Sequence, residues 1–166
     1  MLTRARSHRN ISPTDVVGPR SALVHELTNA YWHELESVTN HLASSTNRDG
    51  ASGERVAGSI HQVIAADLKH AQQVAIRIGQ LHGLPPGADE FAAQKLRLGP
   101  PAEPLDNVSA LTSLIEAETS AIERYRRIAA LAPEAYDWVT QALANQIMRA
   151  KEIHRESLAS FLAPEQ

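Results

Sequence analysis

The sequence predicts an all-α protein in which four long helices form one antiparallel bundle. Apolar residues recur at three- and four-residue spacing in four long segments, as expected for helices with one buried face. The breaks between these segments are rich in Gly, Pro, Asn and Asp, which favour turns. Hydrophobic residues make up 43% of the chain but aromatic residues only 4%, so small and aliphatic side chains dominate and helices can approach closely. A chain of 166 residues can bury one such core.

Composition excludes several classes of function. The formal net charge of -3 provides no overall basic field, so a nucleic-acid partner is not indicated. The chain has no cysteine, which excludes disulfides, thiolate metal sites and cysteine nucleophiles. No stretch is long and apolar enough to span a bilayer, and no apolar run follows the first residues as in a secretory signal. We therefore expect a cytoplasmic protein without a membrane partner.

Residues 1–20 are predicted to form a basic N-terminal tail that precedes a bundle over residues 21–166. The tail contains four arginines against one acid, Asp15, and two prolines, and it lacks helical periodicity. Such a tail can act as a DNA-binding arm, or it can lie over its own or a neighbouring subunit. The second interpretation is favoured because four arginines neutralise few phosphates.

The first helix is expected over residues 21–45. Glu34 lies within its apolar stripe, seven residues before His41. A short turn follows, so the next helix should return antiparallel. The stripe consists of Leu23, Leu27, Ala30, Tyr31, Val38 and Leu42.

The second helix is expected over residues 53–82, and it carries two ionisable residues on its apolar face. Asp67 and His70 are three residues apart, so they share one side of the helix. Gly83 and the prolines after it are a helix stop signal. The apolar members of the stripe are Val56, Ile60, Val63, Ile64, Val74, Ile78 and Leu81.

Residues 83–104 contain five prolines and no sustained pattern, and they form too long a link for two helices joined as a hairpin. A crossover explains this length. A helix of about 30 residues is roughly 45 Å long, and an extended chain of about 22 residues reaches roughly 70 Å. The third helix should therefore run parallel to the second.

The third and fourth helices are expected over residues 105–131 and 133–162, separated by a tight break at Pro133. Glu118 falls inside the third stripe, and Lys151 and His154 fall inside the fourth. The apolar members of the third stripe are Val108, Leu111, Ile115, Ile122, Tyr125 and Ala129, and those of the fourth are Tyr136, Ala144, Ile147, Leu158 and Phe161.

Ionisable residues thus occupy the apolar stripe of every predicted helix, at similar depth. Burying such groups is costly unless they are paired or bind a metal. Carboxylates combined with imidazoles are a ligand set for iron, manganese or zinc. Any one of them could sit at the edge of its stripe and reach solvent. Their coincidence on four helices favours a present or ancestral metal site.

The order of these residues resembles the ferritin-like superfamily, above all bacterioferritin- and rubrerythrin-like four-helix bundles. That order is Glu, then Asp-x-x-His, a proline-rich crossover, Glu, and finally His. The resemblance covers residues 21–162. The local runs that support it are His33-Glu34-Leu35, Asp67-Leu68-Lys69-His70-Ala71, Leu81-His82-Gly83-Leu84-Pro85 and Glu118-Thr119-Ser120-Ala121-Ile122.

The resemblance implies a metal site in which each residue has a role. Glu34 and Glu118 correspond to the two terminal carboxylates, and Asp67 to a shortened bridging carboxylate. His70 and His154 correspond to the two imidazole ligands. The implied cofactor is iron, or manganese or zinc, at one or two ions per chain.

Three departures from the family pattern change that site. Lys151 stands where the family has a second bridging Glu, and Asp67 is one methylene shorter than Glu. Leu68 stands where bacterioferritin has its haem-ligating Met, so we expect no haem. Three carboxylates and one ammonium sum to -2, which one divalent ion would cancel, so a mononuclear site is the simplest expectation.

The expected function is iron binding or oxidation of ferrous iron at a mononuclear or degenerate site, so ferroxidase-type enzymatic activity stays open. The first alternative is a metal-free bundle in which Lys151 pairs with Glu118 or Asp67 and the role is structural or partner binding. A second is a DNA-protecting miniferritin, but its Asp-x-x-x-Glu signature is absent because Ala71 stands four residues after Asp67.

Some further expectations concern other residues and the assembly. We expect a homodimer or a higher homo-oligomer. Tyr31 and Tyr125 are expected in the core. Four histidines are expected at the surface or at stripe edges, namely His25, His33, His61 and His82.

Overall fold

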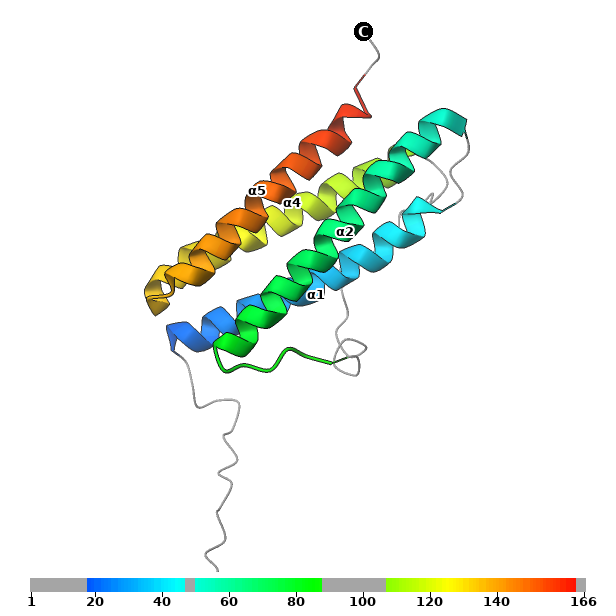
Figure 1. Ribbon diagram of the computed structural model, residues 1–166. Coiled ribbons are helices and arrows are strands. Elements are labelled where there is room, and N and C mark those ends of the chain that lie inside the picture. The colour runs from blue at the N-terminus through cyan, green and yellow to red at the C-terminus, as the bar shows by residue number, and fades with distance from the viewer. Residues whose placement is uncertain (1–17, 47–49, 88–106, 164–166) are drawn as a thin grey trace, which may run out of the picture.

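A computed structural model describes residues 18–46, 50–87 and 107–163, and it confirms the all-α class. Four long helices lie side by side in a bundle (Figure 1). Most of the predicted tail and most of the predicted crossover fall outside the described residues. The helices are α1 (Pro19–Ser45), α2 (Gly50–Gln80), α4 (Asn107–Leu131) and α5 (Trp138–Ser160), with a short 3-10 helix η1 (Ala132–Ala135).

The helix directions agree with the predicted topology of a ferritin-like bundle. α1 and α2 run antiparallel, and α4 and α5 form a second antiparallel hairpin (Figure 1). α2 and α4 point the same way, so the end of α2 and the start of α4 lie at opposite ends of the bundle. The crossover predicted to join these two ends lies largely outside the described residues.

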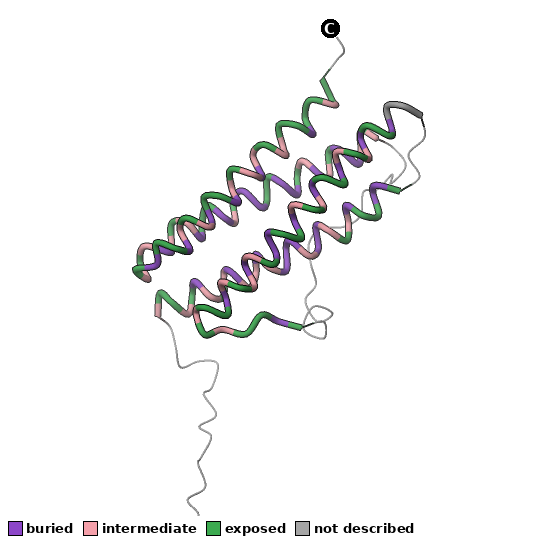
Figure 2. Tube along the Cα trace, viewed as in Figure 1, coloured by how far each residue is buried: buried purple, intermediate pink, exposed green. Residues whose placement is uncertain are grey.

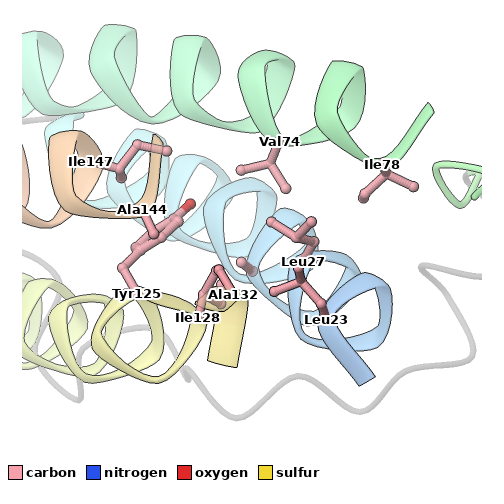
Figure 3. Close-up of a cluster of buried hydrophobic side chains, with 10 residues drawn as sticks. Leu23, Leu27, Val74, Ile78, Tyr125, Ile128, Ala132, Ala144 and Ile147 are labelled. Carbon is pink, nitrogen blue, oxygen red and sulfur yellow. The ribbon is translucent and has the colours of Figure 1, made fainter. Parts of the chain in front are cut away.

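Two apolar clusters fill the interior, and the inward faces of all four helices are buried (Figure 2). The larger cluster joins all four helices near the end where α5 begins (Figure 3). Its fully buried members include Leu23, Leu27, Val74, Ile78, Tyr125, Ile128, Ala144 and Ile147. The second cluster comprises Val56, Ile60, Val63, Leu111, Leu114 and Leu158.

The ionisable residues lie between these two clusters. On α2, Asp67 follows the last residue of the second cluster and precedes the first residue of the larger one. Glu118 on α4 and Lys151 on α5 hold the same intermediate position. On α2, α4 and α5 the polar layer therefore has apolar side chains on both sides, whereas α1 contributes no residue to the second cluster.

α2 ends at the predicted Gly stop, but the residue with left-handed backbone there is not the glycine. His82 is the left-handed residue, with φ 63, while the Gly83 amide donates to the Ile78 carbonyl at 2.9 Å. This pattern is a Schellman motif. A Cβ on Gly83 would lie 2.9 Å from side-chain carbons of Val24 and Ile78, so glycine is needed for close packing.

The prediction of one continuous fourth helix over residues 133–162 is wrong. The chain forms η1 first, turns at Tyr136 with φ 55, and begins α5 at Trp138. Tyr136, predicted in the core, is 86% exposed. Asp137 caps the new helix by accepting a hydrogen bond from the Thr140 amide at 2.9 Å.

Other single-residue expectations also fail. Leu42 and Val108, predicted in buried stripes, are exposed, because His41 and the pair Ala110 and Leu111 take the inward positions. His33, predicted at the surface, is buried. Tyr125 is buried as predicted, Tyr31 is only partly so, and His25, His61 and His82 are exposed as expected.

No helix in the described part of the chain has the length and apolar character needed to cross a membrane.

Candidate metal centre

Four charged side chains meet in the middle of the bundle, one from each helix. Glu34 of α1, Asp67 of α2 and Lys151 of α5 have no exposed surface, and Glu118 of α4 has 1%. Each occupies an inward position of its helix, where its neighbours one turn away are core residues. The layer is therefore built by the same periodicity that builds the core.

Lys151 stands at the centre of this layer and contacts all three carboxylates. Its Nζ lies 2.5 Å from Asp67 Oδ1, 2.9 Å from Glu34 Oε2 and 3.5 Å from Glu118 Oε1. Burial alone would lower the pKa of Lys151, but the three carboxylates outweigh burial and raise it well above its ordinary value. The group is therefore an ammonium ion at neutral pH.

The two carboxylates nearest to Lys151 differ in their titration. Burial raises the pKa of Glu34 to about 7, even though Lys151 opposes the shift. Burial would also raise the pKa of Asp67, but Lys151 and the nearby His41 lower it to about 2. Asp67 is thus the ionised partner, whereas Glu34 holds a proton part of the time near neutral pH.

Tyr125 fixes the orientation of Glu34. Its hydroxyl donates to Glu34 Oε1 at 2.8 Å, and both side chains are fully buried. Burial and the adjacent Glu34 raise the pKa of Tyr125 well above its ordinary value, so Tyr125 stays a donor. The second oxygen of Glu34 is consequently directed to Lys151.

Three histidines surround the carboxylates at distances longer than hydrogen bonds. His41 Nδ1 lies 3.5 Å from Asp67 Oδ2, and His154 Nδ1 lies 3.7 Å from Glu118 Oε2. His70 Nδ1 lies 3.9 Å from both Glu34 Oε2 and Asp67 Oδ1. Hydrogen bonds between nitrogen and oxygen span about 2.7–3.2 Å, so none of these contacts qualifies.

His70 and His154 face each other across the layer. Their ring centroids are 6.5 Å apart. Burial lowers the pKa of His70 to about 4, so its ring is neutral at physiological pH and keeps a free lone pair. A neutral imidazole is the form that binds metal ions.

Several buried polar atoms of the layer have no hydrogen-bond partner among the described residues. Nearly all buried polar atoms in folded proteins have one, so this concentration requires an explanation. The unpaired atoms are Asp67 Oδ2, Glu118 Oε2, His70 Nδ1, His154 Nδ1, both ring nitrogens of His41, and Glu34 Oε2, which has only its ion-pair contact with Lys151. All these atoms are of the types that donate a lone pair to a metal.

The unpaired atoms and their neighbours form two sets of three potential ligands that share one residue. Glu34, Asp67 and His70 form the first set, and Asp67, Glu118 and His154 form the second. Within each set, one ligand atom per residue lies within 4.8 Å of the others. Asp67 belongs to both, which is the position of a bridging carboxylate.

The spacing of imidazoles and carboxylates also suits a metal better than hydrogen bonds. Two ligands about 2.0–2.2 Å from one tetrahedral ion lie about 3.3–3.6 Å from each other. The observed nitrogen to oxygen distances of 3.5 and 3.7 Å at His41 and His154 are close to that range. The donor set and its spacing therefore fit a divalent transition metal.

The structure brings together all five residues that the sequence singled out as ligands, and Lys151 with them. The sequence analysis did not assign His41 or Tyr125 to the site. A signal for His41 was present, because it stands seven residues after Glu34 and so two turns further on the same face. Tyr125 gave no such signal, since a tyrosine on an apolar stripe reads as a core residue.

His33 is a separate buried histidine near the layer. Neither of its ring nitrogens has a hydrogen-bond partner among the described residues. Burial lowers its pKa to about 3, so the ring is neutral. No ion pair joins it to a carboxylate in the described part of the chain, which separates it from His41.

Comparison with known proteins decides the family. The family model for the ferritin-like domain matches residues 24–164, which is most of the chain. The chain belongs to the ferritin-like family. A search of curated proteins found no match for this ferritin-like chain.

Solved structures similar to the ferritin-like chain include two kinds of relative. A dodecameric thioferritin, the bacterioferritin-related protein of Bacteroides fragilis, is 26% identical, with a TM-score of 0.78 over 86% of this chain and 85% of that one. Dps from Thermosynechococcus elongatus is 17% identical, with a TM-score of 0.82 over 89% and 94%. The Dps protein of Vibrio cholerae is 18% identical, with a TM-score of 0.79 over 87% and 91%. The Dps likenesses show the shared fold.

Proposed function

We propose that this ferritin-like chain binds one divalent transition metal ion inside its bundle, through Asp67, Glu118 and His154. Iron is the first candidate, and manganese and zinc are the others. The observation that carries the proposal is that the two oxygens of each of these carboxylates have different surroundings. Asp67 and Glu118 each turn one oxygen to Lys151 and keep a second buried oxygen without a partner.

Charge supports a single ion. Lys151 and Glu34 cancel each other when both are charged, and Asp67 with Glu118 leaves -2, which one divalent cation neutralises. Uncompensated charge in a dry interior is costly, so a second divalent ion beside the ammonium is disfavoured. Lys151 therefore acts as a fixed cation where a second ion would otherwise lie.

Glu34 and His70 belong to the position that Lys151 fills. They complete the five-residue ligand set of the sequence analysis, and they remain suitable for a metal once the ammonium is removed. In the wild-type protein Glu34 is held by Lys151 and Tyr125 instead. The role of Glu34 is to bind the ammonium rather than the ion, and His70 Nδ1 lies 3.9 Å from Glu34 Oε2 and from Asp67 Oδ1.

Family membership supports iron chemistry at this centre. A bound iron ion would supply one-electron exchange with oxygen or peroxide. The protein contributes hard carboxylate oxygens, which hold ferrous and ferric iron, and an imidazole from His154. The apolar clusters on both sides limit the access of water.

Elemental analysis of protein purified without chelator, followed by anaerobic ferrous titration, tests the proposal. We expect about one metal ion per chain, and strongly reduced binding in Glu118→Gln and His154→Gln. Exposed neighbours provide matched controls, Glu116→Gln on the same helix and His61→Gln, which should bind as the wild type does. A wild-type protein that takes up no metal at any loading would overturn the proposal.

That outcome would support a metal-free bundle with a structural or partner-binding role. The contact of Lys151 with all three carboxylates is the observation that favours this alternative. The unpaired oxygens and the three imidazoles weigh against it, because a metal-free network would be expected to satisfy them.

We also propose that the chain assembles into a homodimer or a larger homo-oligomer. The related thioferritin is described as dodecameric. Sedimentation equilibrium of the full chain would measure the assembly directly, and a strictly monomeric protein would contradict it. A gel-shift assay with and without residues 1–17 would test the DNA-protecting alternative.

A further inference from the structure

We propose that one end of the bundle holds a binding pocket for a small aromatic anion, such as an aromatic carboxylate with a single charge. At this end α1 begins, α2 ends and α5 begins (Figure 1). A cavity of about 320 Å³ lies there. Small-molecule sites commonly measure about 300–1,000 Å³, so the cavity suits a small ligand. Its lining residues are Arg20, Arg77, Leu81, Ala135, Tyr136, Asp137, Trp138 and Val139.

The pocket is separate from the proposed metal centre. Trp138 lies about 20 Å from Lys151 along α5, since a helix rises about 1.5 Å per residue. None of the residues that line the cavity belongs to either set of potential metal ligands. The inference therefore does not depend on metal binding, and each proposal can be tested without the other.

Contacts between helices hold the walls of the cavity in place. Arg77 of α2 binds Asp137, the N-cap of α5, with Nη2 and Oδ1 2.6 Å apart. This ion pair ties the end of α2 to the start of α5. Leu81 and Ala135 pack against the larger apolar cluster, so the floor of the cavity is continuous with the core. A ligand would therefore meet a preformed site and would not have to order it.

Two exposed aromatic side chains suit the cavity to a planar ring. Tyr136 is 86% exposed and Trp138 is 62% exposed. Stacked aromatic rings gain affinity beyond the area that they bury. Tyr136 also has a left-handed backbone, with φ 55, which is costly for residues other than glycine and is found mostly at binding and functional sites.

The charges of the cavity favour an anion. Asp137 is fully occupied, because Oδ1 accepts from Arg77 and the Thr140 amide, and Oδ2 accepts from the Thr140 hydroxyl. The charges of Arg77 and Asp137 cancel. Arg20 is exposed, and no acid pairs with it among the described residues. The cavity therefore carries one unbalanced positive charge.

The uncommitted side-chain groups of the cavity are hydrogen-bond donors. They are the Arg20 guanidinium, the Trp138 indole N–H and the Tyr136 hydroxyl, for which the described part of the chain provides no partner. An indole N–H only donates, and a guanidinium binds a carboxylate through two parallel N–H groups. A carboxylate on an aromatic ring would satisfy these donors while its ring stacks on the aromatic side chains. A single unbalanced charge disfavours a polyanion.

Calorimetric titration of the full chain with 2-naphthoate and with its neutral analogue 2-naphthamide tests the proposal. The wild type should bind the acid at least about threefold more tightly than the amide, because only the acid pairs with Arg20. Arg20→Gln should remove this preference and leave the binding of the amide unchanged. Arg149→Gln, which changes an exposed cation of α5, is the matched control and should keep the preference.

Trp138→Ala should weaken the binding of both probes by at least about tenfold, because it removes the ring on which they stack. Ile153→Ala, which changes an exposed apolar residue of the same helix, should bind them like the wild type. The chain has two tryptophans, and Trp32 is buried, so ¹⁹F NMR of protein labelled with 5-fluorotryptophan separates them. Adding 2-naphthoate should shift the Trp138 signal and leave the Trp32 signal in place.

Several outcomes would overturn the proposal. They are a wild type that binds neither probe, equal affinity for acid and amide, and a Trp138 signal that does not respond to the acid. If a second copy of the chain covers the cavity, Trp138→Ala should dissociate the assembly in sedimentation equilibrium and the probes should not reach the wild type. That result would also overturn it. The metal content of every variant should match that of the wild type, so failure of the pocket leaves the proposed function untouched.

Discussion

An ammonium group among three carboxylates determines which atoms of the centre remain free. Lys151 binds one oxygen of each carboxylate, and Tyr125 occupies the other oxygen of Glu34, so the free donors are the outer oxygens of Asp67 and Glu118 and the imidazoles. A methionine or leucine at this position would leave the carboxylates without a counter-ion. A glutamate would instead add a fourth carboxylate. The number of metal ions bound per chain shows the effect of that added carboxylate.

Lys151→Glu should raise the metal stoichiometry from about one to about two ions per chain. The substitution removes the fixed cation and brings the total charge of the carboxylates to -4, which two divalent ions cancel. The two ligand sets that share Asp67 would then both be available. Ferrous titration monitored by elemental analysis measures the change, and any ferroxidase rate should rise with it.

Arg149→Glu is the control for this change, because Arg149 is exposed on the same helix two residues earlier. It introduces the same change of charge without entering the bundle, and its stoichiometry should stay at about one. Equal stoichiometry in Lys151→Glu and wild type would show that the ammonium does not exclude a second ion.

Sequence reasoning located this centre because polar residues on an apolar stripe violate the usual pattern. Glu34, Asp67, His70, Glu118 and His154 were each visible in that way, and the structure places them together. What the sequence could not supply is the choice of partners. Which oxygen meets Lys151 depends on the rotation and depth of four helices, and these are set by tertiary packing.

At the scale of elements, the junction between α4 and α5 shows how local chemistry overrides periodicity. Pro133 suits the first turn of a helix, and apolar residues continue on both sides, so the pattern favours one helix. Instead Asp137 starts α5 as its N-cap and also accepts a hydrogen bond from Arg77 of α2 at 2.6 Å. The capping contact comes from a distant part of the chain, which periodicity cannot reveal.

Asp137→Asn should lower the free energy of unfolding by about 1–3 kcal/mol at neutral pH. Asparagine still caps a helix, but the charge-assisted bond with the largely buried Arg77 is lost. Burial opposes ionisation of Asp137, yet the bonds from Arg77 and Thr140 outweigh it and lower its pKa below the ordinary value of 3.8. Urea unfolding at a series of pH values measures the difference between variant and wild type.

The sign of the pH effect follows from that lowered pKa. The stabilisation by Asp137 is complete above pH 3.8, where the unfolded chain is ionised, and it is lost as the pH falls through the folded pKa. The gap between wild type and Asp137→Asn should therefore close in acid. Glu134→Gln, an exposed acid of the same junction, should differ little from wild type throughout. A gap that stays constant in acid would contradict the ion pair.

At the scale of the whole molecule, the polar layer connects helices that otherwise meet little. Contacts are dense within the α1–α2 and α4–α5 hairpins, but sparse between α2 and α5. The buried pair of Lys151 and Asp67 spans that sparse interface. The ligands of the proposed ion come from α2, α4 and α5, so the ion would join the two hairpins at the same level.

Metal binding should therefore stabilise the whole bundle and not only the centre. An ion bound only by the folded state, present at 100 times its dissociation constant, adds about 2.7 kcal/mol to the free energy of unfolding. Denaturant unfolding with Zn²⁺ or Mn²⁺, compared with the same protein in chelator, should show this gain in a single transition. Because the ligands lie on both hairpins, neither hairpin should unfold while the ion remains bound.

Glu118→Gln should lose this stabilisation by metal. Glu116→Gln, which changes an exposed residue two positions earlier on the same helix, should keep it. In chelator, Glu118→Gln also tests the ion-pair network of Lys151, because the ammonium then keeps two carboxyl partners, Glu34 and Asp67, instead of three. A metal-dependent gain that persists in Glu118→Gln would place the ion elsewhere. A gain confined to the wild type and Glu116→Gln would tie the stability of the bundle to the layer in which its four helices meet.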